Sequence, residues 1–360
     1  MKKYLTSAEY KKWNTKRAEE RLERKIASKE KRKIIRGTIS NYSNKASKQL
    51  LKIIREGIKQ PIIAPNDFRL IENTPECLSF FRNMRSDEYV SSNKLTKFVK
   101  ISLVKVTKID YGTVSILTAI HDSLRIKGIL LQGDLPKNEE CKKFFIDSGF
   151  LNDMVDDKNR SFPKAQKSDL IFFEKGIDFL SNDNSEKISN LIKNAVRHLT
   201  GVSRHFLPIK SILLELCGNS IEWSGSENKQ WLLGIQYEQE KVIFTVTDVG
   251  KGILATLYKS HGKKFRDFIS LKSDDEVLKG AFDKKYGSVS QEVNRNKGLP
   301  SLKVNYEDGN ITNLKVLTNN VILDFDNKNN SKAFPKGTAR FKGTFYQWET
   351  NIWCINNFKN

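Results

Sequence analysis

The stretch Ser211–Ile253 begins with a helical pattern of apolar positions. Ile212, Leu216 and Ile221 recur at roughly helical spacing, and no proline interrupts them. Apolar side chains spaced in this way share one face of a helix. The pattern therefore predicts a helix over residues 211–224.

Two strand-like runs follow this helix, Trp231–Tyr237 and Lys241–Asp248. In the second run Val242, Phe244 and Val246 occupy alternate positions, and β-branched and aromatic residues prevail, which is typical of a strand. Only residues 238–240 separate the two runs, so the pattern predicts a hairpin whose second strand ends at Asp248.

The first half of the chain alternates strand-like and helical segments. The pattern predicts a strand over residues 95–106, a helix over 111–126, a short buried strand over 128–133 and a helix over 138–151. Two strands joined through a helix need a crossover connection, so at least one parallel strand pair is expected.

Further along, the pattern predicts helices over residues 186–201, 254–260 and 274–286 and one after residue 298, then strands over 316–325 and 337–350. The expected fold class is α/β. The expected domains are a basic helical extension (1–60), a small α/β domain (61–155), a polar linker (156–185) and a second α/β domain (186–360).

The positive charge is concentrated at the start of the chain. The net charge is +21, and residues 1–60 hold 19 Lys and Arg against 6 Asp and Glu, which leaves +8 for the other 300 residues. Such a basic helical arm favours nucleic-acid phosphates or an acidic partner, and the alternatives are an anionic membrane surface and a solvated basic helix.

Other features of the composition exclude several classes of protein. No apolar run is long enough to span a bilayer, and residues 1–13 have no apolar core of a secretory signal. The four cysteines are scattered, without a Cys-x-x-Cys motif, so neither a zinc site nor a disulfide framework is expected. A reducing, cytoplasmic location fits these observations.

Chemistry is expected first on the helix over residues 211–224. Glu215 and Asn219 are four positions apart, so both side chains leave one face of that helix. An amide oxygen is a suitable ligand for Mg²⁺, and a carboxylate can orient or deprotonate an attacking water. The pair suits a magnesium nucleotide.

The end of the second predicted strand carries a matching motif. Asp248 is followed by Gly250, Gly252 and Ile253. A carboxylate at a strand end can accept a hydrogen bond from the amine of adenine, and glycines let the backbone approach a ligand closely.

These two motifs, in this order and with a hairpin between them, resemble the N box (Glu-x-x-x-Asn) and the G1 box (Asp-x-Gly-x-Gly) of the GHKL, or Bergerat-fold, ATP-binding domains. That family includes gyrase, sensor histidine kinases and anti-sigma-factor kinases. The resemblance implies that Asn219 ligates Mg²⁺ and that Asp248 reads adenine. It also implies that Glu215 acts as the general base where ATP is hydrolysed.

Two later segments extend the resemblance. The family closes an ATP lid and a Gly-x-Gly-Leu loop over the phosphates, and here only Gly298 and Leu299 remain, followed by Pro300. Arg295 and Lys297 are cations that can contact phosphate in place of the missing glycine. Thr344, after Gly343, resembles the family's final Gly-Thr box, whose hydroxyl reaches a phosphate.

The strand–helix–strand–helix run before the linker resembles a STAS domain, the fold of anti-sigma-factor antagonists. That family places Asp-Ser-Ser-Gly at the head of its first helix, with the second Ser as phosphoacceptor. Here Asp110 is followed by Tyr111, Gly112 and Thr113, so Gly112 takes the acceptor position. The resemblance implies a protein-interaction module that has lost this switch.

Taken together, the sequence predicts an Mg·ATP-binding GHKL-type ATPase or nucleotide switch that regulates a partner. The alternatives are a protein Ser/Thr kinase of the anti-sigma-factor type and a non-catalytic nucleic-acid-binding scaffold. An unidentified protein, nucleic acid bound by residues 1–60 and a second copy of the chain all remain open as partners.

Overall fold

The computed structural model describes the following residues: 59–92, 96–152, 154–156, 160–162, 171–177, 182–223, 230–260, 272–286 and 298–358. The chain divides into two compact units, residues 1–58 and residues 59–360, and all described residues belong to the second. The predicted basic extension, residues 1–60, lies outside the described residues except for Lys59 and Gln60.

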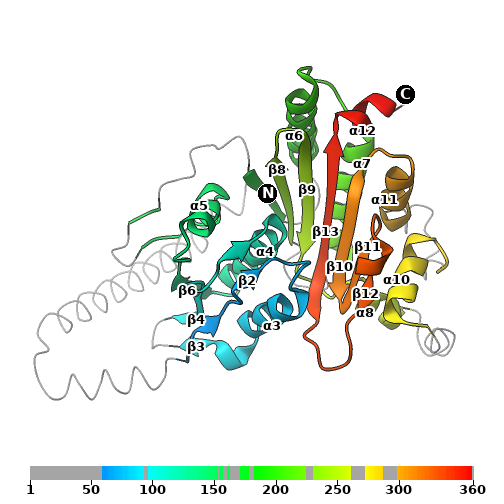
Figure 1. Cartoon of the computed structure of the whole chain (residues 1–360). Coiled ribbons are helices and arrows are strands. Elements are labelled where there is room, and N and C mark those ends of the chain that lie inside the picture. Colours follow the sequence, from blue (N-terminus) through cyan, green and yellow to red (C-terminus); the bar gives the residue numbers. More distant parts are fainter. Residues whose placement is uncertain are drawn as a thin grey trace, which may run out of the picture. The chain divides into compact units, whose positions relative to one another are not determined.

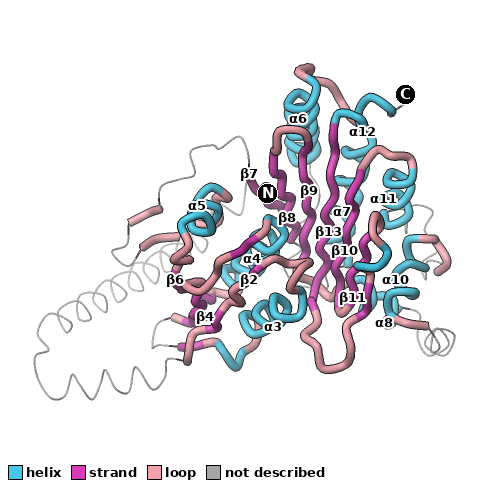
Figure 2. Tube along the Cα trace, viewed as in Figure 1, coloured by secondary structure: helices cyan, strands magenta, loops and turns pink. Residues whose placement is uncertain are grey.

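A seven-stranded sheet forms the centre of the second unit (Figure 2). Its strand order is β12–β11–β10–β13–β9–β8–β7, and all neighbouring strands are antiparallel. The strands are β7 Ile171–Ile177, β8 Gln230–Tyr237, β9 Lys241–Asp248, β10 Thr312–Asn319, β11 Val321–Asp324, β12 Lys332–Ala333 and β13 Phe341–Asn351. The last strand of the chain thus lies between β9 and β10.

Helices from the second half of the chain cover one face of this sheet (Figure 1). They are α6 Asn182–Thr200, α7 Leu207–Trp223, α8 Ile253–Ser260, α10 Asp274–Phe282, α11 Gly298–Glu307 and the short α12 Ile352–Asn357. Their apolar faces share a buried core with the sheet, in which Phe244 and Trp348 stack with ring centroids 5.7 Å apart. Burial of aromatic and aliphatic surface on this scale is the main source of fold stability.

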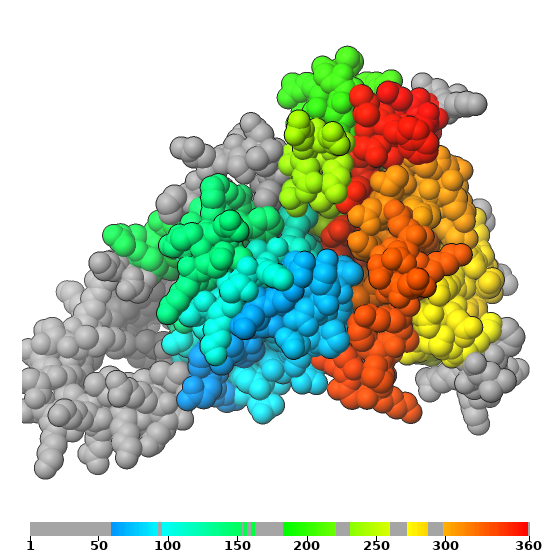
Figure 3. Space-filling view, viewed as in Figure 1, coloured from blue at the N-terminus to red at the C-terminus, as the bar shows by residue number. Residues whose placement is uncertain are grey.

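The segment before the linker, residues 59–156, covers the opposite face of the sheet and is called the N-terminal layer below. Its elements are β1 Ile62–Ile63, β2 Asp67–Phe68, α3 Thr74–Met84, β3 Ser91–Ser92, β4 Lys97–Ser102, β5 Lys108–Ile109, α4 Tyr111–Ile126, β6 Ile129–Asp134 and α5 Glu139–Asp147. Its core is continuous with Leu317, Ile322, Phe341 and Phe345 of the large sheet. On the drawn face, Figure 3 shows the two parts in direct contact.

Helix α4 of this layer packs closely against the sheet. An ideal Cβ at Gly112 would lie 2.9 Å from Phe345 Cζ, so only glycine fits there without displacement. The Ser115 hydroxyl lies 2.8 Å from Thr247 Oγ1 and 3.2 Å from Thr245 Oγ1, and all three groups are buried. Because Thr113 is also buried, no hydroxyl at this helix start is open to a kinase.

Most of the predicted elements are present. The helix over residues 111–126 and the strand over 241–248 have the predicted bounds, and the expected parallel pair is β4 with β6. Asp110 begins α4 as its cap, since its carboxylate accepts hydrogen bonds from the N–H groups of Thr113 and Leu70, each 2.7 Å long.

Three predictions differ from the structure. Strand β6 is not buried, because among the described residues it pairs on one side only, with β4, and lies at the edge of its small sheet. The single strand predicted over residues 316–325 is a hairpin, because Asn319 has a φ of 53° and reverses the chain between β10 and β11. Within the predicted linker, residues 171–177 form β7, since their backbone pairs with β8.

Within the compact unit of residues 59–360, the N-terminal layer and the large sheet bury apolar surface against each other. None of the helices in the described part of the chain combines the length and the apolar character needed to cross a bilayer.

We expect Gly112→Leu to destabilise the second unit by about 1–3 kcal/mol, because the new side chain overfills the space between α4 and Phe345. Urea unfolding of the full-length protein measures this change. Ile126→Leu, at the exposed end of the same helix, is the control and should change the free energy of unfolding by no more than about 0.5 kcal/mol. Equal effects of the two substitutions would contradict the close packing of α4.

Candidate nucleotide site

Helix α7 presents Glu215 and Asn219 beside its buried face. Leu213, Leu216 and Cys217 of this helix are buried in the core, which sets the orientation of the helix on the sheet. Glu215 and Asn219 are partly buried, next to that face. The spacing of four thus places both side chains on one face, as the sequence predicts.

The start of α11 lies directly over this pair. An ideal Cβ at Gly298 would clash with Asn219 Nδ2 and would lie 2.8 Å from Glu215 Cγ. Any larger residue at position 298 would therefore push the acid–amide pair aside. The N-terminal end of a helix carries free N–H groups and a partial positive charge, so it favours an anion beside it.

Asp248 and Thr344 form a second group on the sheet. They are cross-strand partners in the pairing of β9 with β13, and both are buried. Phe244 and Val246 of β9 point into the helix-covered core, and side chains two apart along a strand share a face. Asp248 therefore faces the same side of the sheet as α7, and Thr344 does so by the same alternation from Tyr346.

Burial raises the pKa of Asp248 from 3.8 to about 6. Hydrogen bonds from the Gly250 N–H and the Thr344 hydroxyl and the positive charge of Arg85 oppose this rise. The Gly250 N–H donates to Asp248 Oδ1 over 2.9 Å. The site thus holds a desolvated carboxylate, which binds a hydrogen-bond donor more strongly than a carboxylate in water does.

The loop from Val249 to Ile253 is held by the β10–β11 turn. The Asn319 amide donates to the Lys251 carbonyl over 2.9 Å, and an ideal Cβ at Gly252 would lie only 2.6 Å from Asn319 Oδ1. Gly252 has a φ of 84°, a conformation that favours glycine. Gly252 of the predicted motif thus has a local structural reason to be glycine.

The same turn caps helix α8. Thr318 Oγ1 accepts a hydrogen bond from the Ile253 N–H over 2.9 Å, and Asn319 Oδ1 accepts one from Ala255 over 3.2 Å. These N–H groups have no partner inside the helix. Side chains of a distant strand therefore satisfy them.

The structure places the remaining predicted site residues as follows. Ile253 and Leu299 are partly buried and pack against the helix-covered core from the starts of α8 and α11. Arg295 and Lys297 lie outside the described residues. The predicted residues that are described therefore form two groups, Glu215–Asn219–Gly298 and Asp248–Thr344 with the glycine loop, on one side of the sheet.

Sequence reasoning missed three residues that shape this site. Thr318 and Asn319 hold the glycine loop, and the Asn319–Asn320 pair between two apolar runs was an available turn signal. Arg85 of the N-terminal layer reaches the loop through the Val249 carbonyl, 2.8 Å from its Nη2. No local pattern around Arg85 indicates this contact, because it joins residues 164 positions apart.

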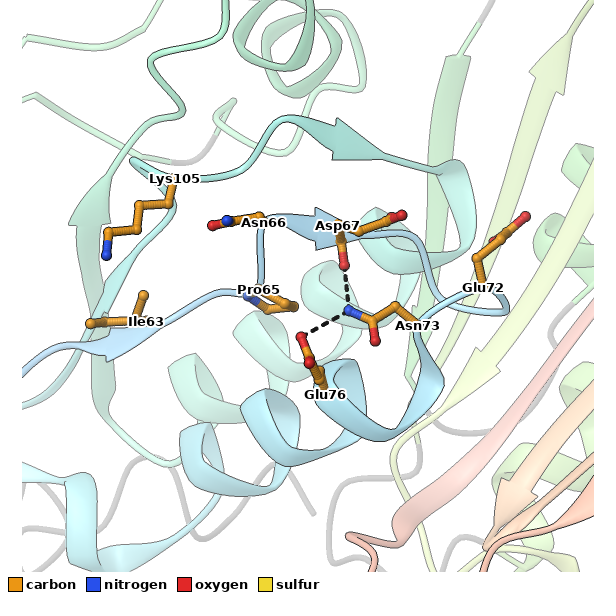
Figure 4. A pocket seen from close by; sticks show the side chains of 8 residues that line it. All are labelled: Ile63, Pro65, Asn66, Asp67, Glu72, Asn73, Glu76 and Lys105. Carbon is orange, nitrogen blue, oxygen red and sulfur yellow. Dashed lines mark hydrogen bonds between the residues drawn. The ribbon is translucent and has the colours of Figure 1, made fainter.

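A separate open hollow of about 580 Å³ lies in the N-terminal layer (Figure 4). It is lined by Ile63, Pro65, Asn66, Asp67, Glu72, Asn73, Glu76 and Lys105. Asp67 binds Arg69 at 2.6 Å, and Asn73 donates to Glu76 over 3.0 Å. None of the predicted site residues lines this hollow. The carboxylate of Asp67 and the side chains of Asn73 and Glu76 are already bonded to neighbouring residues.

We expect Asp248→Asn to stabilise the protein at pH 8 by up to roughly 2–3 kcal/mol and to have little effect near pH 4. The folded-state pKa lies above the unfolded value, so the folded state retains the proton longer. The carboxylate therefore lowers stability as the pH rises from about 4 through about 6, and an amide does not. Urea unfolding of both proteins from pH 4 to 8 tests this, and parallel profiles would contradict it.

Comparison of the chain with models of known protein families and with curated protein sequences gives no match. The geometry of the chain's own residues is therefore the basis for a functional assignment.

Proposed function

We propose that this chain is an Mg·ATP-binding protein of the GHKL type, in which the helix-covered side of the sheet holds the nucleotide. The observation that carries the proposal is the position of Gly298. Its backbone lies against both Glu215 and Asn219, so the start of α11 meets the acid–amide pair of α7 although 79 residues separate Gly298 from Asn219. The order of the motifs in the sequence does not by itself require this contact.

The two groups of residues have complementary chemistry. The Asn219 amide oxygen can supply one ligand to Mg²⁺, which keeps several waters and takes further oxygens from phosphates. The backbone N–H groups at the start of α11 suit a phosphate. Glu215 can orient or deprotonate a water there, which is the role of a general base in hydrolysis.

Asp248 supports an adenine base over a guanine. Adenine presents an amine donor at the position where guanine presents a carbonyl oxygen. A buried carboxylate accepts a hydrogen bond from the amine, whereas it repels the carbonyl oxygen, and burial makes both effects larger. The bound base would also replace part of the solvation that Asp248 has lost on folding.

Calorimetric titration with Mg·ATP tests the proposal. Asp248→Ala removes one hydrogen bond to a charged group, so we expect affinity to fall by about tenfold to a hundredfold, and GTP should bind the wild type correspondingly less well. Gly298→Ala should weaken binding by about tenfold, because its Cβ displaces Asn219.

Ser301→Ala, a substitution in the same helix as Gly298, is the matched control and should bind Mg·ATP like the wild type. Wild-type protein that fails to bind Mg·ATP, or an Asp248→Ala variant with unchanged affinity, would rule out this assignment.

Hydrolysis is tested separately from binding. We expect slow phosphate release from Mg·ATP by the wild type and a loss of at least about a hundredfold in Glu215→Gln, since removal of a general base typically costs that much. Glu215→Gln should still bind Mg·ATP, because the amide keeps the size of the carboxylate. Equal phosphate release by the two proteins would exclude Glu215 as the base.

A further inference from the structure

One guanidinium of the N-terminal layer contacts both strand ends that carry Asp248 and Thr344. Arg85 directly follows helix α3, and its Nη2 donates to the Val249 carbonyl over 2.8 Å. Its Nη1 donates to the carbonyl of Lys342. Val249 follows Asp248 in the chain, and Lys342 lies two residues before Thr344.

These two carbonyls lie just beyond the end of the strand pairing. In the register of β9 with β13, Asp248 pairs with Thr344, and no pair of these two strands lies beyond it. Gly343 has a φ of 150°, and an ideal Cβ there would clash with the Asp248 carbonyl oxygen, so the two backbones are very close at this point. The planar, forked guanidinium of Arg85 is suited to bridge two acceptors in one geometry.

We infer that Arg85 is a positioning residue of the nucleotide site, which sets the spacing of Asp248 and Thr344 and thereby makes adenine binding depend on the docked N-terminal layer. This inference rests on the proposed function. The N-terminal layer would then support the nucleotide site of its own chain, because the start of α4 is buried against the same sheet that carries Asp248.

Charge supports the same role. Arg85 is partly buried, burial lowers its pKa, and the charge of Asp248 opposes that change. In return the positive charge of Arg85 helps to keep Asp248 ionised. Tyr346 is a further ionisable neighbour among the described residues, and burial together with the charge of Asp248 raises its pKa. Arg85 thus acts on the carboxylate both through the backbone and through its charge.

A purely structural role for Arg85 would lower stability and leave the carboxylate unchanged. Three variants of the full-length protein separate the two roles. Arg85→Gln removes the charge, and Arg85→Lys keeps a charge but lacks the planar fork that holds both carbonyls in one fixed geometry. Arg82→Gln, one turn earlier and exposed on the same helix, is the control.

The first readout needs no nucleotide. Carbon-13 NMR of labelled aspartate, assigned with Asp248→Asn, gives the ionisation pH of Asp248, and hydrogen exchange gives the protection of the Gly250 amide. We expect Arg85→Gln to raise that ionisation pH and to speed exchange at Gly250. Arg85→Lys should restore the ionisation pH more fully than the protection, and Arg82→Gln should match the wild type.

The second readout is calorimetric affinity for Mg·ATP at pH 7.5. We expect a loss of about tenfold in Arg85→Gln and a smaller loss in Arg85→Lys. A folded Arg85→Gln protein with unchanged affinity and unchanged Asp248 ionisation would overturn the inference. If Arg85→Gln does not fold, wild-type values in Arg85→Lys for both affinity and Gly250 exchange would overturn it.

The two readouts also separate this inference from the proposed function. A wild type that binds no Mg·ATP refutes the proposed function, and with it the dependence of adenine binding on Arg85. The changes at Asp248 and Gly250 in Arg85→Gln would then still establish that Arg85 positions Asp248, and their absence would overturn that part as well.

Discussion

The pairing of β13 with β9 is the interaction on which the candidate site depends. It places Thr344 opposite Asp248 and brings Gly343 against the Asp248 carbonyl, although about a hundred residues separate the two strands. Through β13, β10 also joins the sheet, and the turn after β10 supplies Thr318 and Asn319 to the glycine loop. Strand order in the sheet thus assembles a loop, a turn and two strand ends at one place.

Burial of both faces of the large sheet explains why residues 59–360 form one compact unit. Helices from the second half of the chain cover one face, and α3 and α4 cover the other (Figure 1). Gly112 and Ser115 make that second contact close, one by lacking a side chain and the other through buried hydroxyl contacts. The start of α4 is therefore an internal packing surface, and Arg85 extends the same contact to the edge of the candidate site.

Burial of the Asp248 carboxylate lowers the stability of the folded protein at neutral pH. A buried carboxylate with a pKa near 6 is unfavourable at neutral pH, and Asp248 is compensated only in part by the Gly250 amide, the Thr344 hydroxyl and Arg85. Groups with perturbed pKa values are concentrated at functional sites, because the environment that a ligand requires is not the one that favours folding. In the proposed function, a hydrogen-bond donor on the nucleotide base would satisfy the remaining hydrogen-bonding capacity of this carboxylate.

Sequence alone determined the features that depend on local periodicity. The helix over residues 111–126, the strand that ends at Asp248 and the common face of Glu215 and Asn219 follow from spacings of two, three and four residues. Tertiary structure alone decided which elements become neighbours: the place of β13, the exposed edge of β6, the hairpin at Asn319 and the reach of Arg85. Periodicity shows that a face is buried but not what covers it, because the covering surface comes from distant parts of the chain.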